Sequence, residues 1–284
     1  MLSSCDPQRV ACVRHSGNER IPYHDIQKAQ KTSRIDNVQL GDFTEQADAY
    51  RRSRPAYPDE LIDMLVADAG LALGDAVADF GAGTGIMTRM LIERGFVVSA
   101  IEPNDSMRSQ AEVTEAHWVA GTFEQSLLET ASQQWAIAAQ AFHWADPLRA
   151  LPEIRRVLQP GCLFTVLWNN RSKAADDTVS WTDAAIRRQI PEFDEAYRNR
   201  PWKEILESSG DFTFVTQRTV SHTIPMSRER FLHLWKSHNR LNTIAGPIRF
   251  AAFFEELSDH LDQLPIDLIN VRYDCESWSA RRND

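Results

Sequence analysis

Long apolar segments and closely spaced cysteines are both absent from this sequence. Its four cysteines, Cys5, Cys12, Cys162 and Cys275, show no C-x-x-C spacing, which argues against a structural zinc site. No stretch approaches the ~20 apolar residues of a membrane helix. The N-terminal residues carry several charges in place of the apolar core of a secretory signal. We therefore expect a cytoplasmic protein with reduced cysteines and no bound metal.

Clustered positive charge is also absent. The chain has 31 Lys+Arg against 40 Asp+Glu, a net charge of −9, and no run of Lys or Arg is longer than two. Such a protein repels phosphate backbones and anionic membrane surfaces. We therefore expect a small-molecule substrate, with neither nucleic acid nor a membrane as partner. A homodimer stays open.

Repeats and low-complexity tracts are missing too, and the composition is that of a folded globular protein. Residues 1–40 are polar and weakly patterned, which predicts an N-terminal extension. A length of 284 residues suits one large α/β domain with insertions. We therefore expect a single domain over residues 41–284, with helical insertions at about 171–208 and 227–264.

From residue 76 onward, short apolar runs alternate with helical segments. The expected strands are 76–80, 96–101, 118–119, 135–141, 162–168, 212–224 and 268–274. The expected helices between the first five strands are 84–94, 105–113, 122–131 and 147–158. This alternation predicts a Rossmann-like α/β fold, in which right-handed crossovers place helices on both faces of a parallel sheet.

The first of these strands ends in a glycine-rich loop, Asp79-Phe80-Gly81-Ala82-Gly83-Thr84-Gly85. The dinucleotide pattern G-x-G-x-x-G would need its third glycine at position 86, where this chain has Ile86. Asp79 is a poor neighbour for a pyrophosphate and a good one for a cation. Glu102 ends the second strand, where a carboxylate accepts ribose hydroxyls. Together these residues favour S-adenosylmethionine, although a glycine turn or a strand-end Glu is common on its own.

Five short motifs between residues 43 and 168 carry a family resemblance. They are Tyr50 with Arg54-Pro55-x-Tyr57-Pro58, the loop 79–85, Glu102-Pro103-Asn104-x-x-Met107, Gln140-Ala141-Phe142-His143-Trp144 and Arg156-Val157-Leu158-x-Pro160-Gly161. The series resembles the class I S-adenosylmethionine-dependent methyltransferases, in the small-molecule branch described as UbiE-like or trans-aconitate-methyltransferase-like. The resemblance implies a seven-stranded, mainly parallel sheet with an antiparallel last strand. The chain departs from the pattern at Trp135-Ala136, where the family often has Asp, and at Cys162, which replaces a glycine.

The same resemblance implies a cofactor site at the strand ends. Its members are Tyr50, Arg54, Asp79, Gly81, Ala82, Gly83, Glu102, Pro103, Met107, Thr122, Phe123 and Gln140. Within this set, Glu102 accepts the ribose hydroxyls, and Tyr50 and Arg54 close over the methionine carboxylate. Thr122 and Phe123, at the start of the expected helix 122–131, supply backbone contacts to adenine.

The acceptor side rests on fewer residues. His143 is the candidate general base, and its alternative role is a hydrogen bond at the sheet edge. Trp144, Trp168 and Asn169 are the candidate substrate residues, against a role in core packing. We expect methyl transfer to O, N or C of a small organic molecule. A non-catalytic S-adenosylmethionine-binding protein and, further off, a nicotinamide oxidoreductase are the alternatives.

Overall fold

The structure is a computed structural model that describes residues 53–172, 177–194 and 198–284. These residues belong to one compact unit, which spans residues 38–284. Tyr50 lies outside the described residues, as do Cys5 and Cys12. The boundary near residue 40 and the extent of the helical insertions stay predictions.

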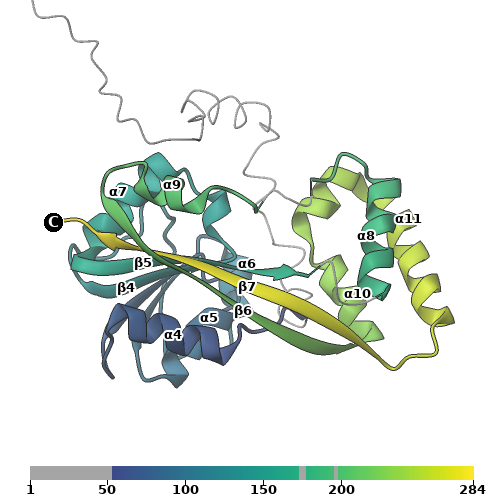
Figure 1. Ribbon diagram of the computed structural model, residues 1–284, viewed down its shortest axis with the longest axis horizontal. Coiled ribbons are helices and arrows are strands. Elements are labelled where there is room, and N and C mark those ends of the chain that lie inside the picture. Colours follow the sequence, from purple (N-terminus) through teal and green to yellow (C-terminus); the bar gives the residue numbers. More distant parts are fainter. Residues whose placement is uncertain (1–52, 173–176, 195–197) are drawn as a thin grey trace, which may run out of the picture. The chain divides into compact units, whose positions relative to one another are not determined.

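A seven-stranded sheet forms the centre of this unit, with the strand order β3-β2-β1-β4-β5-β7-β6 (Figure 1). Its strands are β1 (Ala76–Phe80), β2 (Val97–Ile101), β3 (His117–Val119), β4 (Gln133–Ala139), β5 (Leu158–Arg171), β6 (Phe212–Ser227) and β7 (Leu268–Arg282). The strands β1 to β5 pair in parallel, and β7 runs antiparallel to both β5 and β6. The predicted parallel sheet with an antiparallel last strand is confirmed.

Helices cover both faces of the sheet (Figure 1). They are α4 (Asp59–Ala69), α5 (Ile86–Glu93), α6 (Asp105–Ser109), the 3-10 turn η1 (Phe142–Trp144), α7 (Pro147–Val157), α8 (Asp177–Gln189), α9 (Trp202–Glu207), α10 (Arg228–Lys236) and α11 (Asn239–Gln263). Helix α4 buries Leu61, Ile62 and Leu65 against the sheet and ends at Gly70, which has a left-handed φ of 67°. Helices α4 and α5 share one hydrophobic cluster, and α7 and α9 share another.

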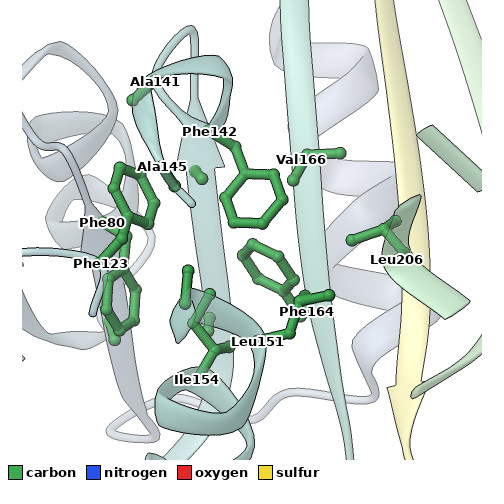
Figure 2. Close-up of a cluster of buried hydrophobic side chains, with 14 of the residues drawn as sticks. Phe80, Phe123, Ala141, Phe142, Ala145, Leu151, Ile154, Phe164, Val166 and Leu206 are labelled. Atoms are coloured by element: carbon green, nitrogen blue, oxygen red, sulfur yellow. The ribbon is translucent and has the colours of Figure 1, made fainter. Parts of the chain in front are cut away.

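The cluster beneath α7 and α9 is rich in aromatic rings (Figure 2). Phe123 stacks on Phe80 with ring centroids 5.6 Å apart and meets the edge of Phe142 at 5.5 Å. Phe142 in turn meets the edge of Phe164 at 5.2 Å. These offset and edge-to-face contacts add to the hydrophobic gain from burial. They also join the carboxyl ends of β1 and β4 into one rigid support.

A further hydrophobic cluster lies at the end of the antiparallel β6–β7 pair where α10 and α11 connect the two strands. The β5–β7 ladder stops at Arg171↔Tyr273, whereas β6 and β7 go on pairing from Thr223↔Arg272 to Ser227↔Leu268. Helices α8, α10 and α11 pack on this extension, and their cluster includes Met226, Trp235 and Phe253 (Figure 1). We call this part the cap. It consists of α8, α10 and α11 with the paired segments 223–227 of β6 and 268–272 of β7.

The predicted helix 122–131 is wrong. Residues 120–132 form a loop, in which Leu127 and Ala131 have left-handed φ values of 64° and 52°. The carboxylate of Glu153 in α7 accepts hydrogen bonds from the N–H and hydroxyl of Ser126, at 2.9 and 2.6 Å. Because these bonds satisfy the backbone from outside the segment, the loop needs no helix.

Candidate functional site

The glycine loop lies between β1 and α5 and turns through left-handed backbone. Gly81, Gly83 and Gly85 have φ values of 69°, 59° and 83°. A Cβ at Gly81 would lie 2.5 Å from the Cβ of Ala141, so this position requires glycine for space as well as for conformation. At Gly83 the nearest atom would be the flexible end of Met107, at 3.3 Å.

Four backbone N–H groups of the loop, those of Gly81, Ala82, Gly83 and Gly85, have partners within the protein. Gly81 and Ala82 donate to the carbonyl of Ile101, at 2.8 and 3.0 Å. Gly85 donates to the carbonyl of Ala82 at 2.9 Å, and Gly83 donates to a carboxylate described next. A pyrophosphate site needs such N–H groups directed at the ligand. These four N–H groups donate within the protein instead.

Glu102 is held at the end of β2 by two backbone hydrogen bonds. Its Oε2 accepts from the N–H of Gly83 and its Oε1 from the N–H of Asn104, both at 2.9 Å. The side chain is buried, and burial raises its pKa while the two bonds oppose that rise. Each carboxylate oxygen has a second lone pair. A fixed carboxylate beside a glycine loop can therefore accept two further hydroxyl groups.

Asp79, the residue before Phe80 in β1, is buried with only 1% of its surface exposed. Its Oδ2 accepts a hydrogen bond of 2.6 Å from the hydroxyl of Thr88, and its Oδ1 has no partner among the described residues. Burial raises the pKa of Asp79 to about 7, and the charge of Glu102 adds to the rise. A buried acceptor without a donor carries an energetic cost, which a bound cationic group would relieve.

Gln140 follows β4 and has a left-handed φ of 59°, which is uncommon for a residue with a Cβ. Its N–H donates to the carbonyl of Leu167, and its Nε2 donates to the carbonyl of Asn169 at 3.1 Å. Its Oε1 is buried and lacks a partner in the described part of the chain. Strained backbone with a free acceptor is typical of a ligand-binding position.

The remaining predicted cofactor residues divide into buried and exposed ones. Met107 is buried against Gly83, and the ring of Phe123 lies beside Gly81. Pro103 and Thr122 are exposed at the same edge of the sheet. Thr122 begins a turn and not a helix, since its N–H donates to the carbonyl of Gln125 at 2.9 Å.

Arg54 lies beside the cap. Its Nη2 donates to the carbonyl of Ser237, which follows α10, at 3.4 Å. Its positive charge also lowers the pKa of His238. The predicted contact with a methionine carboxylate stays a prediction.

His143 lies in the turn η1, at the carboxyl end of β4. Its Nδ1 accepts a hydrogen bond from the indole of Trp168 at 3.4 Å. Burial and then the positive charges of Arg198, Arg200 and Arg240 hold the pKa of His143 well below its usual range. A neutral histidine that accepts at Nδ1 carries its proton at Nε2. The Nδ1 of this ring is therefore engaged by the indole of Trp168.

The predicted substrate residues have different environments. Trp168 is fully buried and stacks on Trp202 with centroids 4.0 Å apart. Trp144 lies next to His143, with ring centroids 4.5 Å apart. Asn169 is buried, and its Oδ1 lies 2.8 Å from the Nε2 of His222.

The sequence motifs did not point to His222, Arg171 or Tyr273. Strand pairing places Tyr273 of β7 directly between Arg171 of β5 and His222 of β6. The three residues come from segments without a shared motif. Only the register of the two antiparallel ladders could have found them.

Two absences apply to the described ranges. Within residues 53–172, 177–194 and 198–284, no group of three or more His, Cys, Asp or Glu side chains is placed to hold a metal ion. In the same part of the chain, no helix has the length and apolar character to cross a membrane.

The strand order with an antiparallel β7 is the arrangement that the resemblance to class I S-adenosylmethionine-dependent methyltransferases implies. Comparison with known proteins agrees with this class. Residues 78–166 match the sequence profile of a family described as "Methyltransferase domain". Residues 78–166 are therefore similar to a methyltransferase domain.

Relatives from other organisms are also methyltransferases by name. The chain is 41% identical over 135 residues to an uncharacterized methyltransferase of Mycobacterium tuberculosis, covering 47% of this chain and 52% of that protein. It is 28% identical over 247 residues to an uncharacterized methyltransferase of Schizosaccharomyces pombe, covering 80% and 93%. The chain thus spans about half the length of the first of these curated relatives.

A solved structure from Anaeromyxobacter dehalogenans, named as a type II methyltransferase, has the same fold. It superposes with a TM-score of 0.55 at 23% identity and covers 80% of this chain and 97% of its own. At this identity the likeness concerns the fold alone.

Proposed function

We propose that this protein transfers a methyl group from S-adenosylmethionine to O, N or C of a small organic acceptor. The observation that carries the proposal is the pair of buried carboxylates at the glycine loop. Asp79 has a free acceptor beside the loop, and Glu102 is fixed by Gly83 and Asn104. S-adenosylmethionine brings an ammonium, a sulfonium and a ribose diol, and these groups match the two carboxylates.

In this proposal, different residues at the strand ends bind different parts of the cofactor. Glu102 accepts the ribose hydroxyls, and Asp79 Oδ1 with Gln140 Oε1 accepts from the ammonium group. Gly81, Ala82 and Gly83 let the ligand approach bare backbone. Pro103, Met107, Thr122 and Phe123 flank the adenine, the last two from a turn. Tyr50 and Arg54 bind the methionine carboxylate.

The protein has little covalent chemistry to supply, because the sulfonium of the bound cofactor is already an activated methyl donor. Its residues align the acceptor with that methyl group and exclude water. His143 as general base remains a prediction from the sequence. Its bond with Trp168 supports the other role, a histidine that forms a hydrogen bond at the sheet edge and shapes the pocket. An acceptor that arrives ionised would need no base.

The two alternative functions differ in what they require of the loop. A nicotinamide oxidoreductase needs loop N–H groups for a pyrophosphate, and here Gly81, Ala82, Gly83 and Gly85 donate within the protein. A non-catalytic S-adenosylmethionine-binding protein needs the same carboxylates as an enzyme. The geometry therefore favours S-adenosylmethionine over NAD as the ligand. A measurement of methyl-transfer activity then distinguishes an enzyme from a non-catalytic binding protein.

The experiment has a binding arm and a turnover arm. Calorimetry with S-adenosylhomocysteine and with NAD should show binding of the first alone. Incubation with methyl-labelled cofactor and a panel of carboxylic acids, phenols and amines should yield an acceptor that gains one methyl group. The variant Glu102→Gln is the matched control and should bind S-adenosylhomocysteine more weakly. Binding of NAD without S-adenosylhomocysteine would restore the oxidoreductase, and binding without methylated product would favour the non-catalytic protein.

A further inference from the structure

Positive charge gathers at the junction of the sheet and the cap, although the whole chain carries a net charge of −9. Arg171 ends β5, and its guanidinium lies 4.1 Å from the ring centroid of Trp235 in α10. Arg230, in the first turns of α10, donates from Nε to the carbonyl of Ser53 at 3.4 Å. In the described ranges, neither Arg171 nor Arg230 forms an ion pair with a carboxylate.

Tyr273 is a residue on which the positive charges of both Arg171 and Arg230 act. It is directly opposite Arg171 in the β5–β7 ladder, so their side chains share one face of the sheet. Only 3% of its surface is exposed, and its hydroxyl has no hydrogen-bond partner among the described residues. A buried hydroxyl without a partner points to a missing ligand.

Electrostatics around the junction agree with this geometry. Burial raises the pKa of Tyr273, and the charges that oppose the rise all come from arginines: Arg171, Arg54, Arg230 and Arg198. Burial and the charges of Arg54, Arg171 and Arg198 lower the pKa of His238 as well. The field at both rings is positive, and arginine is the side chain best suited to carboxylate and phosphate groups.

A short chain of contacts joins this junction to the cofactor site. Gln140 donates to the carbonyl of Asn169, whose Oδ1 lies 2.8 Å from the Nε2 of His222. The ring of His222 lies 5.6 Å from that of Tyr273. A ligand held at Tyr273 would therefore lie near the place where the methyl group is transferred.

We propose that Arg171, Arg230 and Tyr273 form an oxyanion site for the methyl acceptor, and that the acceptor is a small anionic molecule. The inference rests on the proposed methyl transfer and narrows its acceptor. Two arginines form charge-assisted hydrogen bonds to a carboxylate or phosphate group, and the tyrosine hydroxyl donates a further one. Amines and neutral phenols are excluded as good acceptors.

The test uses the full chain saturated with S-adenosylhomocysteine and titrated with three probes. These are succinate, its neutral diamide succinamide, and inorganic phosphate, each followed by calorimetry. The wild-type protein should bind succinate or phosphate at least about tenfold more tightly than succinamide, since hydrogen bonds to charged groups are lost with the amide. The stronger of the two anions identifies the oxyanion as carboxylate or phosphate.

The variants Arg171→Gln and Arg230→Gln should each lower the affinity for the anion by about tenfold or more, whereas Arg171→Lys should keep part of that affinity. Arg149→Gln, which removes an exposed arginine of α7, is the matched control and should change nothing. Binding of S-adenosylhomocysteine reports that each variant is folded. If Arg171→Gln no longer binds S-adenosylhomocysteine, the anion affinities of Arg230→Gln and Arg171→Lys decide the question.

Two results would overturn the oxyanion site. One is equal binding of succinate and succinamide, and the other is unchanged anion affinity in both glutamine variants. Either result leaves the proposed methyl transfer intact if S-adenosylhomocysteine still binds and a neutral acceptor is methylated. Failure of S-adenosylhomocysteine to bind the wild-type protein would instead contradict the proposed function itself.

Discussion

The raised pKa of Asp79 makes the stability of the protein depend on pH. Its pKa is raised from 3.8 to about 7, mainly by burial, so the folded state holds a proton that the unfolded state releases. The stabilisation from this group is complete below pH 3.8, the pKa of the carboxyl in the unfolded chain. It is lost as the pH rises through about 7, the pKa in the folded protein. The buried carboxylate thus becomes costly in the pH range where a cationic ligand would bind it.

We therefore predict that the wild-type protein loses stability relative to Asp79→Asn between about pH 5 and about pH 8, by ~1–3 kcal/mol. Chemical denaturation at both pH values measures the two free energies of unfolding. Saturating S-adenosylhomocysteine should reduce the loss, since its ammonium group stabilises the ionised carboxylate. A constant difference between wild-type protein and variant over this pH range would contradict the prediction.

Glu102 allows a direct test of ribose binding. Glu102→Ala removes the acceptor of two hydroxyl groups and leaves the N–H groups of Gly83 and Asn104 without their partner. Affinity for S-adenosylhomocysteine should fall by ~1–3 kcal/mol, measured by calorimetry. Glu129→Ala, an exposed carboxylate of the loop before β4, is the control. Equal affinities in the two variants would place the ribose elsewhere.

The loop between β1 and α5 is the element on which the cofactor site depends. Its turn at Gly81 combines a left-handed φ of 69° with a 2.5 Å approach to Ala141. Gly210, before β6, has a similar φ of 76° but open space around it. The two glycines therefore separate the cost of backbone conformation from the cost of crowding.

We predict that Gly210→Ala lowers the free energy of unfolding by about 1 kcal/mol, because only the left-handed conformation is penalised. Gly81→Ala should lower it by ~1–3 kcal/mol more, since the added methyl group displaces the loop or Ala141. Gly81→Ala should also lower the affinity for S-adenosylhomocysteine, whereas Gly210→Ala should leave that affinity unchanged. Chemical denaturation and calorimetry measure both effects. Equal losses of stability would show that the loop has room at Gly81.

The sequence predicts elements well where the determining contacts are local. Strand β1 is found over its full range, 76–80, because an apolar run ends at a glycine turn. The loop at 120–132 is missed because Glu153, 27 residues away from Ser126, satisfies its backbone. Strand β7 goes beyond its predicted end at 274 because buried Ser277 and Ser279 interrupt the apolar pattern.

The candidate site follows the same rule. Asp79, Gly81 and Glu102 are recognisable in the sequence, since they stand at the ends of strands within continuous motifs. The arginines that act on Tyr273 are not, because Arg171 is placed opposite Tyr273 only by strand pairing and Arg230 belongs to α10, which is distant in the sequence. The cofactor side is thus readable from the chain, and the acceptor side needs the fold.

The whole molecule has separate hydrophobic clusters for the sheet and for the cap. Phe253 is fully buried in the cap cluster, and Phe164 is fully buried under α7 and α9. Since each cluster has its own set of buried residues, a cavity in one should destabilise that part first.

We predict that Phe253→Ala and Phe164→Ala each lower the free energy of unfolding by ~3–5 kcal/mol. Hydrogen exchange should increase in α8, α10 and α11 for the first variant and in α7, α9 and β5 for the second. Affinity for S-adenosylhomocysteine should fall more with Phe164→Ala, which lies in the cluster of Phe80 and Phe123. Exchange that increases equally throughout the chain in both variants would show a single cooperative core.

The place of β7 between β5 and β6 has a consequence for biosynthesis. The strand that fills this gap, residues 268–282, is translated after both of its neighbours. Until those residues leave the ribosome, β5 and β6 each hold an unpaired edge, and such edges are templates for aggregation. The nascent chain can therefore complete its sheet only after residues 268–282 have been made, and shielding of the two open edges by chaperones would matter most just before that point.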